Sequence, residues 1–350
     1  MRHRSMGVLS NILSSETQLP DYLFFVLDKI GYHFSSIDNI YDPNLKKPVP
    51  LWTLLLPGAG CAWAKTKDGG CYMCGFAKAA ANITGGKILK SQELLKYYKI
   101  NENYVARNNP RIITIYSGGS FLNSSEVPFD AQMEIFRELA NHPTVETVFV
   151  ETRPEYIDEQ NLSSLLKMLG KKKLVVGIGL ECKSDEIREK FINKGFTKKM
   201  YEAAVTILKK HYVGVATYVF VKPLFLSEKE AIEESVRTTS YAFERCSDEV
   251  VLEAAFVQKK TTMEKYYRSK QYTPPWLWSI VEVLKRTRHL GPVRVGDFSD
   301  FPTPVALPKN CPDCTIKVKQ VFGFYKTSLD VSLFNFLKCD CQKKWQKLIQ

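Results

Sequence analysis

The chain has 350 residues, enough for one large domain with a full core, and its 45% hydrophobic content is ordinary for a globular protein. Its 49 Lys and Arg residues outnumber its 37 Asp and Glu residues, which gives a net charge of +12. This charge indicates either a polyanionic partner such as RNA or only a lysine-rich surface that is solvated. No apolar run is long enough to span a membrane, and no secretion signature opens the chain, so a cytoplasmic protein is expected. Nine cysteines, an odd number, argue against the disulfide framework of a secreted domain.

Strand and helix patterns alternate along most of the chain. Residues 1–48 are expected to form an amino-terminal helical extension, with a helix over 19–30. Strand candidates follow at 51–57, 112–116, 145–150, 174–180, 213–221 and 250–256, with helical patterns at about 91–105, 130–141, 161–170, 185–210 and 227–245. Repeated strand–helix–strand units form parallel sheets with right-handed crossovers. The sequence therefore predicts an α/β fold, a partial (β/α)6 barrel over residues 49–300 that is open on one side to a large substrate.

Three cysteines lie close together after the first of these strands. Cys61, Cys71 and Cys74 fall within fourteen residues, on the loop leaving the carboxyl end of strand 51–57. The active sites of α/β folds usually lie at the carboxyl ends of the parallel strands. Three thiolates on a cubane iron–sulfur cluster would leave one iron open to a cofactor or substrate. The alternatives are a zinc site, which lacks a fourth ligand before Cys182, and a disulfide with a spare thiol.

Polar residues follow four of the later strands. They are the turn Ser117-Gly118-Gly119-Ser120, and the single residues Glu151, Glu181 and Lys222. Taken one at a time, each could be a helix cap or a surface ion pair. The carboxyl ends of parallel strands lie at one edge of the sheet, so these polar residues and the cysteine loop are expected to lie close together. Their grouping indicates a functional site.

The carboxyl-terminal segment, residues 301–350, carries a second set of cysteines. Cys311, Cys314, Cys339 and Cys341 form a C-x2-C pair and a C-x-C pair, which suits a structural zinc ion. A second iron–sulfur cluster and unligated buried thiols are the alternatives. Basic and aromatic residues over 317–326 either contact RNA or form a core beneath the metal. The two other cysteines, Cys182 and Cys246, are expected to be buried in the core.

Several stretches together resemble the radical S-adenosylmethionine superfamily, in the branch that includes the elongator catalytic subunit. They are the cysteine loop, Ser-Gly-Gly-Ser at 117–120, Glu-Thr-Arg-Pro-Glu-Tyr-Ile at 151–157, Gly-Leu-Glu-Cys-Lys-Ser-Asp-Glu-Ile-Arg at 179–188 and Asn-Lys-Gly at 193–195. Gly-Cys-Tyr-Met-Cys-Gly at 70–75 and the cysteine-rich tail further resemble RaSEA, the family of radical enzymes of archaeosine synthesis. One departure is the nine residues between Cys61 and Cys71, where the superfamily usually has three.

The resemblance implies a [4Fe-4S] cluster on the three loop cysteines, with an open iron that binds the amino and carboxylate groups of S-adenosylmethionine. Gly118, Gly119 and Ser120 match the turn that meets the methionyl amine, although many relatives have an acid where Ser120 stands. Glu151 and Glu181 are candidates for ribose or amino contacts, and with Lys222 they are candidates to address the substrate.

The implied reaction is C–N bond cleavage of a lysine-adducted 7-deazaguanine in the D-loop of tRNA, which gives archaeosine. The implied partners are tRNA, the archaeosine synthase subunit that transfers the lysine, and an electron donor. Two alternatives stay open. One is another radical enzyme of the elongator-like branch that modifies RNA, and the other is a non-catalytic, zinc-bearing RNA-binding protein.

Overall fold

The computed structural model describes residues 35–298 and 303–350. The helix expected over 19–30 lies outside the described residues. Residues 35–48, which the sequence patterns assigned to a helical extension, form strand β1 (Ser35–Asp42) and the start of β2 (Lys47–Leu55). β1 is held by its antiparallel pairing with β2, a tertiary contact that local sequence patterns do not report.

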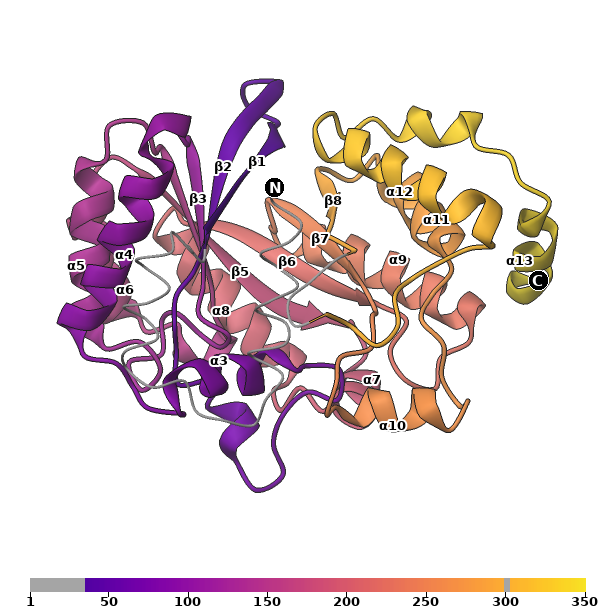
Figure 1. The fold of residues 1–350 in the computed structure, drawn as a ribbon, viewed down its shortest axis with the longest axis horizontal. Helices are drawn as coiled ribbons and strands as arrows, with labels where there is room; N and C mark the ends of the chain where they lie inside the picture. Colours follow the sequence, from indigo (N-terminus) through magenta and orange to yellow (C-terminus); the bar gives the residue numbers. More distant parts are fainter. Residues whose placement is uncertain (1–34, 299–302) are drawn as a thin grey trace.

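An eight-stranded sheet in the order β1 to β8 forms the centre of the molecule. From β2 to β8 every neighbouring pair is parallel. The further strands are β3 (Ile112–Tyr116), β4 (Thr147–Glu151), β5 (Lys173–Glu181), β6 (Gly214–Val221), β7 (Glu249–Ala254) and β8 (Val293–Val295). The pairing ends at β8 without returning to β1, so the curled sheet is an open half-barrel (Figure 1). The predicted fold class is therefore confirmed, with two edge strands that the sequence patterns missed.

Helices cover the outer face of this sheet (Figure 1). They are α4 (Ser91–Val105), α5 (Phe129–Asn141), α6 (Glu159–Leu169), α8 (Lys198–Lys210), α9 (Glu228–Glu244) and α11 (Leu277–Thr287). The helices α3 (Phe76–Thr84) and α10 (Thr262–Arg268) lie instead beyond the carboxyl ends of the strands (Figure 1). Alternate strand residues such as Ile113 and Ile115 are fully buried beneath the helices, in one core with Leu94 of α4 and Phe136 of α5. The residues between them face the inside of the barrel, as the two-residue period of a strand requires.

The helix predicted over 185–210 is in fact two elements. A short α7 (Asp185–Ile187) continues into a π-helical turn at Arg188–Ile192, and α8 starts only at Lys198. The break falls at Asn193 and Gly195, whose φ values of 57° and 73° are left-handed and end a right-handed helix. The prediction of one continuous helix was therefore wrong.

The carboxyl-terminal segment consists of α12 (Pro312–Lys326), a 3-10 helix at Val331–Phe336 and α13 (Cys341–Ile349). Its buried residues Phe322, Tyr325 and Trp345 share one hydrophobic core with Leu252 of β7 and Trp278 of α11. The segment thus packs against the last strands and α11, as the yellow helices of Figure 1 show. Within the predicted basic and aromatic stretch, Phe322 and Tyr325 are core residues, whereas Phe324 of α12 is 66% exposed.

The two remaining cysteines differ in burial. Cys182 is fully buried, as expected. Cys246 is exposed, contrary to expectation, because it lies in the turn after α9 with a left-handed φ of 64°. In the described part of the chain, no helix has the length and apolar character needed to cross a membrane.

Candidate functional site

The inside of the half-barrel is a cavity of about 1130 Å³. Its walls are the inward-facing strand residues, for example Thr114 and Tyr116 of β3 and Phe149 of β4. At the carboxyl edge of the sheet, the three cysteines of the loop after β2 also line this cavity. The sheet therefore brings the predicted cysteine site and the barrel interior into one space.

Cys61, Cys71 and Cys74 are free, half-buried thiols. Burial raises the pKa of Cys71 to about 12 despite the opposing Lys194 ammonium, and burial also raises the pKa of Cys74. A bound metal would supply the positive charge that keeps such thiolates deprotonated. Among the described residues, only the carboxyl-terminal cysteines converge to the spacing of a single ion. The wider separation of the loop cysteines suits a multi-iron cluster better than one zinc ion.

The segment that breaks the predicted helix braces the cysteine loop. The Asn193 side-chain amide donates to the carbonyl oxygens of Asp68 and Gly70, at 2.9 and 3.0 Å. In return, the Trp63 indole donates to the Asn193 carbonyl at 2.9 Å. A Cβ atom at Gly195 would lie 2.4 Å from the Trp63 ring, so only glycine allows this approach. The Asn-Lys-Gly stretch therefore fixes the loop from the side.

A second brace is Glu126, which the sequence patterns did not identify. Its carboxylate is 4% exposed and accepts hydrogen bonds from the amides of Ala62 and Ser120, at 2.9 and 2.6 Å. The Asn123 side chain donates to it as well, at 2.8 Å. Because Glu126 lies in an irregular stretch, no periodicity or spacing marked it in advance. It joins the cysteine loop to the turn after β3.

The predicted turn residues Gly118, Gly119 and Ser120 all line the cavity. A Cβ atom at Gly119 would lie 1.9 Å from the Glu126 carboxylate and 3.0 Å from Cys61 Cα, so the turn is packed directly on the cysteine loop. The Ser120 hydroxyl accepts a hydrogen bond from the Arg153 amide at 3.1 Å. This contact couples the turn to the end of β4.

The two predicted glutamates also face the cavity. Glu151 ends β4 beside Tyr218, whose pKa is raised well above its usual value by burial and by the nearby Glu151 carboxylate. Glu181 lies at a bulge of β5 with a left-handed φ of 66°. Its carboxylate accepts a hydrogen bond from the Lys194 ammonium at 2.6 Å. Both carboxylates are thus held at the edge where the cysteines lie.

Lys222 is placed differently. Its side chain is buried in an ion pair with Glu228, and it is not among the residues that line the cavity. Glu228 also accepts a hydrogen bond from the Ser279 hydroxyl, which in turn accepts one from the Trp345 indole at 2.8 Å. The structure therefore groups Glu151 and Glu181 with the cysteines but puts Lys222 in a network that reaches α13.

Three polar groups on the cavity wall have unused hydrogen-bonding capacity: one is Arg294 Nη1, and the other two, on Arg153 and Gln258, lie beside the cysteine loop. Arg153 Nη2 and Gln258 Nε2 are buried and have no hydrogen-bond partner among the residues that the structure describes. Both residues line the cavity. Gln258 already accepts a hydrogen bond from the Gly75 amide, next to Cys74. Buried donors are normally satisfied, so these two indicate that a polar ligand belongs in the cavity.

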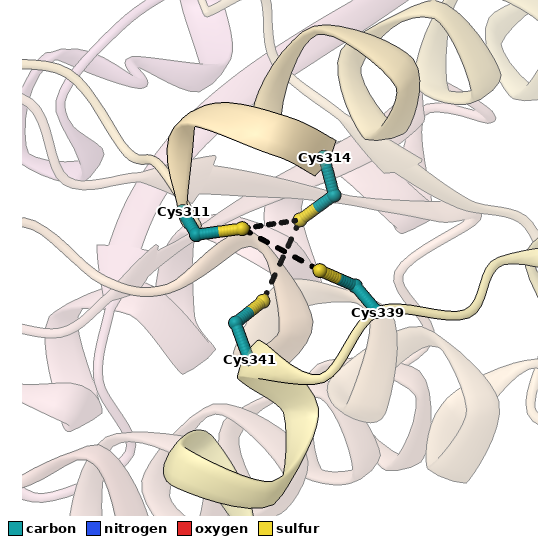
Figure 2. Close-up of side chains that lie close together, drawn as sticks. All are labelled: Cys311, Cys314, Cys339 and Cys341. Carbon is teal, nitrogen blue, oxygen red and sulfur yellow. Dashed lines mark hydrogen bonds between the residues drawn. The ribbon is translucent and has the colours of Figure 1, made fainter.

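The carboxyl-terminal cysteines form a compact group (Figure 2). The sulfur of Cys311 lies 3.6 Å from Cys314 and 3.4 Å from Cys339, and Cys314 lies 3.5 Å from Cys341. Four thiolates bound to zinc at about 2.3 Å would be separated by about 3.8 Å in a tetrahedron. The Trp278 indole donates to the Cys341 sulfur at 3.2 Å, as an outer partner of a metal ligand would. The spacing therefore fits one tetrahedral metal ion.

An open β/α half-barrel with a three-cysteine loop at its carboxyl edge agrees with the fold implied by the sequence resemblance to the radical S-adenosylmethionine superfamily. The chain is 33% identical over 303 residues to archaeosine synthase subunit beta of Methanosarcina acetivorans, a match covering 85% of this chain and 84% of the relative. The protein of the same name from Thermococcus kodakarensis is 29% identical over 91% of this chain and 96% of its own length. The chain therefore belongs to the archaeosine synthase subunit beta family.

Two further comparisons add little to this assignment. No family model matches the chain. Among solved structures, the Elp3 protein of Methanocaldococcus infernus, without residues 1–46, overlaps 65% of this chain and 57% of its own. The overlap has 16% identity and a TM-score of 0.49, which is too distant to carry a functional argument.

Proposed function

We propose that the protein is the radical S-adenosylmethionine subunit of an archaeosine synthase. In this proposal it cleaves a C–N bond of a lysine-adducted 7-deazaguanine in the D-loop of tRNA, leaving the formamidine of archaeosine. The observation that carries the proposal is the position of Cys61, Cys71 and Cys74 together on the wall of one large cavity. The family membership of the chain supports the choice of substrate.

The three loop cysteines would hold a [4Fe-4S] cluster, and S-adenosylmethionine would bind beside it. When bound, these groups would supply the radical chemistry that activates the lysyl part of the substrate. Gly118, Gly119 and Ser120 would meet the methionyl amine, while Glu151 and Glu181 would contact the ribose or an amino group. The role of the protein is to orient both ligands and to exclude water from them.

The size of the cavity supports two ligands. Pockets for a single small molecule usually measure about 300–1,000 Å³, and this cavity measures about 1130 Å³. A base buried in folded RNA would have to be extruded to reach it. The cavity could therefore hold S-adenosylmethionine together with one modified nucleotide.

The charge of the cavity supports a substrate that carries an amine. Eight Asp and Glu residues line it against five Lys and Arg residues, an excess of three acids. The whole chain, by contrast, carries a net charge of +12. A basic exterior attracts a polyanion such as tRNA, and an acid-rich interior favours the ammonium group of a lysyl adduct.

The proposal includes three partners and a second metal. The relatives are named as subunits, so a second subunit that transfers the lysine is expected, along with tRNA and an electron donor. The four carboxyl-terminal cysteines would hold one zinc ion, which would join the starts of α12 and α13. Lys222 would have a structural role because it pairs with Glu228 away from the cavity wall.

An assay with two matched substrates tests this function. Anaerobically reconstituted and reduced protein is incubated with S-adenosylmethionine and tRNA carrying the lysine adduct, or the same tRNA carrying only the 7-cyano base. Archaeosine and 5′-deoxyadenosine should form with the lysine adduct alone. Turnover of the nitrile alone would show that the proposed substrate is wrong.

A further inference from the structure

Arg153 is a buried arginine at the carboxyl edge of the sheet, and its neighbours fix its side chain. It follows β4 by two positions, and its side chain is 8% exposed. Its guanidinium carbon lies 5.3 Å from the centres of both the Trp63 and the Phe196 rings. Its Nε atom donates to the Glu155 carboxylate. The side chain is therefore held on three sides by contacts that fix the plane of the guanidinium.

One edge of this fixed guanidinium has no protein partner. Nη2 is buried and makes no hydrogen bond to any described residue, although Arg153 lines the cavity. Leaving a buried charged donor unsatisfied is costly, and a preorganised guanidinium is well suited to bind a carboxylate or phosphate. The missing partner is therefore expected to be an anionic group of a ligand in the cavity.

The neighbours of Arg153 point to one end of one ligand. Trp63, which packs on the guanidinium, is two residues from Cys61 in the cysteine loop. The Arg153 amide binds Ser120 in the turn proposed to meet the methionyl amine. Arg153 is thus beside the place where the methionyl group of S-adenosylmethionine would lie.

We infer that Arg153 binds the carboxylate of the methionyl group of S-adenosylmethionine through Nη2. This inference rests on the proposed function, since it requires S-adenosylmethionine in this cavity. Glu155 is the positioning residue, because it holds Nε and so directs the other edge of the guanidinium toward the cavity. The guanidinium could instead bind a phosphate of the RNA or the carboxylate of the lysyl adduct, and the test below distinguishes these three anionic groups.

The test compares S-adenosylmethionine with its decarboxylated analogue, which lacks only the carboxylate. Dissociation constants are measured anaerobically by calorimetry for cluster-loaded wild type, Arg153→Met, Arg153→Lys and Glu155→Gln. Each of the two ligands is measured without RNA, and tRNA with and without the lysine adduct is measured separately. The matched control is Arg137→Met, because Arg137 is an exposed arginine of α5 that pairs with Glu134. Iron content and circular dichroism are measured for every variant.

Arg153→Met should weaken S-adenosylmethionine binding about ten- to hundredfold and should change binding of the decarboxylated analogue much less. Arg153→Lys should lose part of the affinity for S-adenosylmethionine, because lysine keeps the positive charge but lacks the planar guanidinium with its paired N–H donors. Glu155→Gln should also weaken binding of S-adenosylmethionine more than binding of the decarboxylated analogue, but by a smaller factor. If Arg153→Met folds poorly, the two milder variants provide the same comparison. Arg137→Met should match the wild type.

Equal losses for both ligands in the Arg153 variants would overturn the inference, as would unchanged binding of S-adenosylmethionine. An effect confined to binding of tRNA or of the lysyl adduct would also overturn it, because it would assign Arg153 to the substrate. Wild-type protein that carries the cluster but does not bind S-adenosylmethionine would contradict the proposed function itself and the inference with it. Failure of the inference alone therefore leaves S-adenosylmethionine binding by the wild type intact, whereas failure of the proposed function abolishes it.

Discussion

The Glu126 carboxylate accepts a hydrogen bond from the Ala62 amide, 2.9 Å away, and so attaches the cysteine loop to the segment after β3. Another oxygen of the same carboxylate accepts one from the Ser120 amide. A single buried side chain therefore sets the distance between the loop proposed to carry the cluster and the turn proposed to hold the cofactor.

Glu126→Gln should weaken this link. The amide nitrogen of glutamine would face a backbone N–H that needs an acceptor, so a buried donor is left unsatisfied at a cost of about 2–3 kcal/mol. We expect a lower urea midpoint and less iron retained per chain after anaerobic desalting. The control is Glu134→Gln, since Glu134 lies on the surface of α5. Iron retention and a urea midpoint equal to those of the wild type would show that Glu126 does not secure the loop.

The sequence predicted the centre of the barrel well because its parallel strands are continuous apolar runs. The pattern over 112–116 matches β3 residue for residue, and the helix over 91–105 matches α4. β1 and β8 were missed because edge strands are short or only half buried. The α7–α8 break was missed because Asn193 and Gly195 interrupt the helix in order to contact the cysteine loop, a purely tertiary cause.

The candidate site was predicted only in part for a similar reason. The type and spacing of cysteines predict a metal site from sequence alone, and the sulfur atoms of the four carboxyl-terminal cysteines do lie close enough to bind one ion. Glu126, Arg153 and Gln258 gave no such signal, because acids, arginines and glutamines are common and only their burial sets them apart. Lys222 was chosen for its place at a strand end, but its partner Glu228 on α9 could not be inferred from that position.

Lys222→Met should reduce stability rather than chemistry. It leaves the Glu228 carboxylate buried without its cation, which typically costs about 3–5 kcal/mol. The free energy of unfolding in urea should fall accordingly, while cleavage of S-adenosylmethionine per bound cluster stays near the wild-type value. Lys209→Met, which removes a more exposed pair with Asp248, should cost less than about 1 kcal/mol. A folded Lys222→Met protein that has lost cleavage would restore Lys222 as a catalytic residue.

The carboxyl-terminal cysteines should bind one zinc ion per chain. Cys311→Ala and Cys341→Ala each remove one of four ligands, so zinc measured by plasma emission should fall strongly and α13 should become sensitive to proteolysis. Cys246→Ala is the matched control, because Cys246 is exposed and lies outside this group. Zinc retained at the wild-type level in both variants, or iron found in its place, would refute the assignment.

RNA binding should depend on the carboxyl edge of the sheet. Phe225 follows β6 there, is 52% exposed, and lies 5.2 Å from Phe191 and 5.0 Å from Tyr266 between ring centres. Exposed aromatic rings next to a site can stack on unpaired bases. We expect Phe225→Ala to weaken binding of tRNA about tenfold at fixed salt, measured by filter binding.

Tyr212 provides the control for this measurement. It precedes the same strand at the opposite end, is 98% exposed and, like Phe225, has a left-handed φ. Tyr212→Ala should therefore leave tRNA binding unchanged. If the two substitutions have equal effects, the RNA does not approach preferentially from the edge that carries the cysteines.

The central claim is that the cysteine loop drives radical chemistry on a lysine-bearing nucleotide of tRNA. The most direct measurement is product analysis by mass spectrometry after reduced protein is mixed with S-adenosylmethionine and tRNA carrying the lysine adduct. The wild type should give archaeosine and 5′-deoxyadenosine, and the triple variant Cys61→Ala, Cys71→Ala, Cys74→Ala should give neither. Archaeosine formed by the triple variant, or no archaeosine from wild type that holds its cluster and cleaves S-adenosylmethionine, would contradict the account.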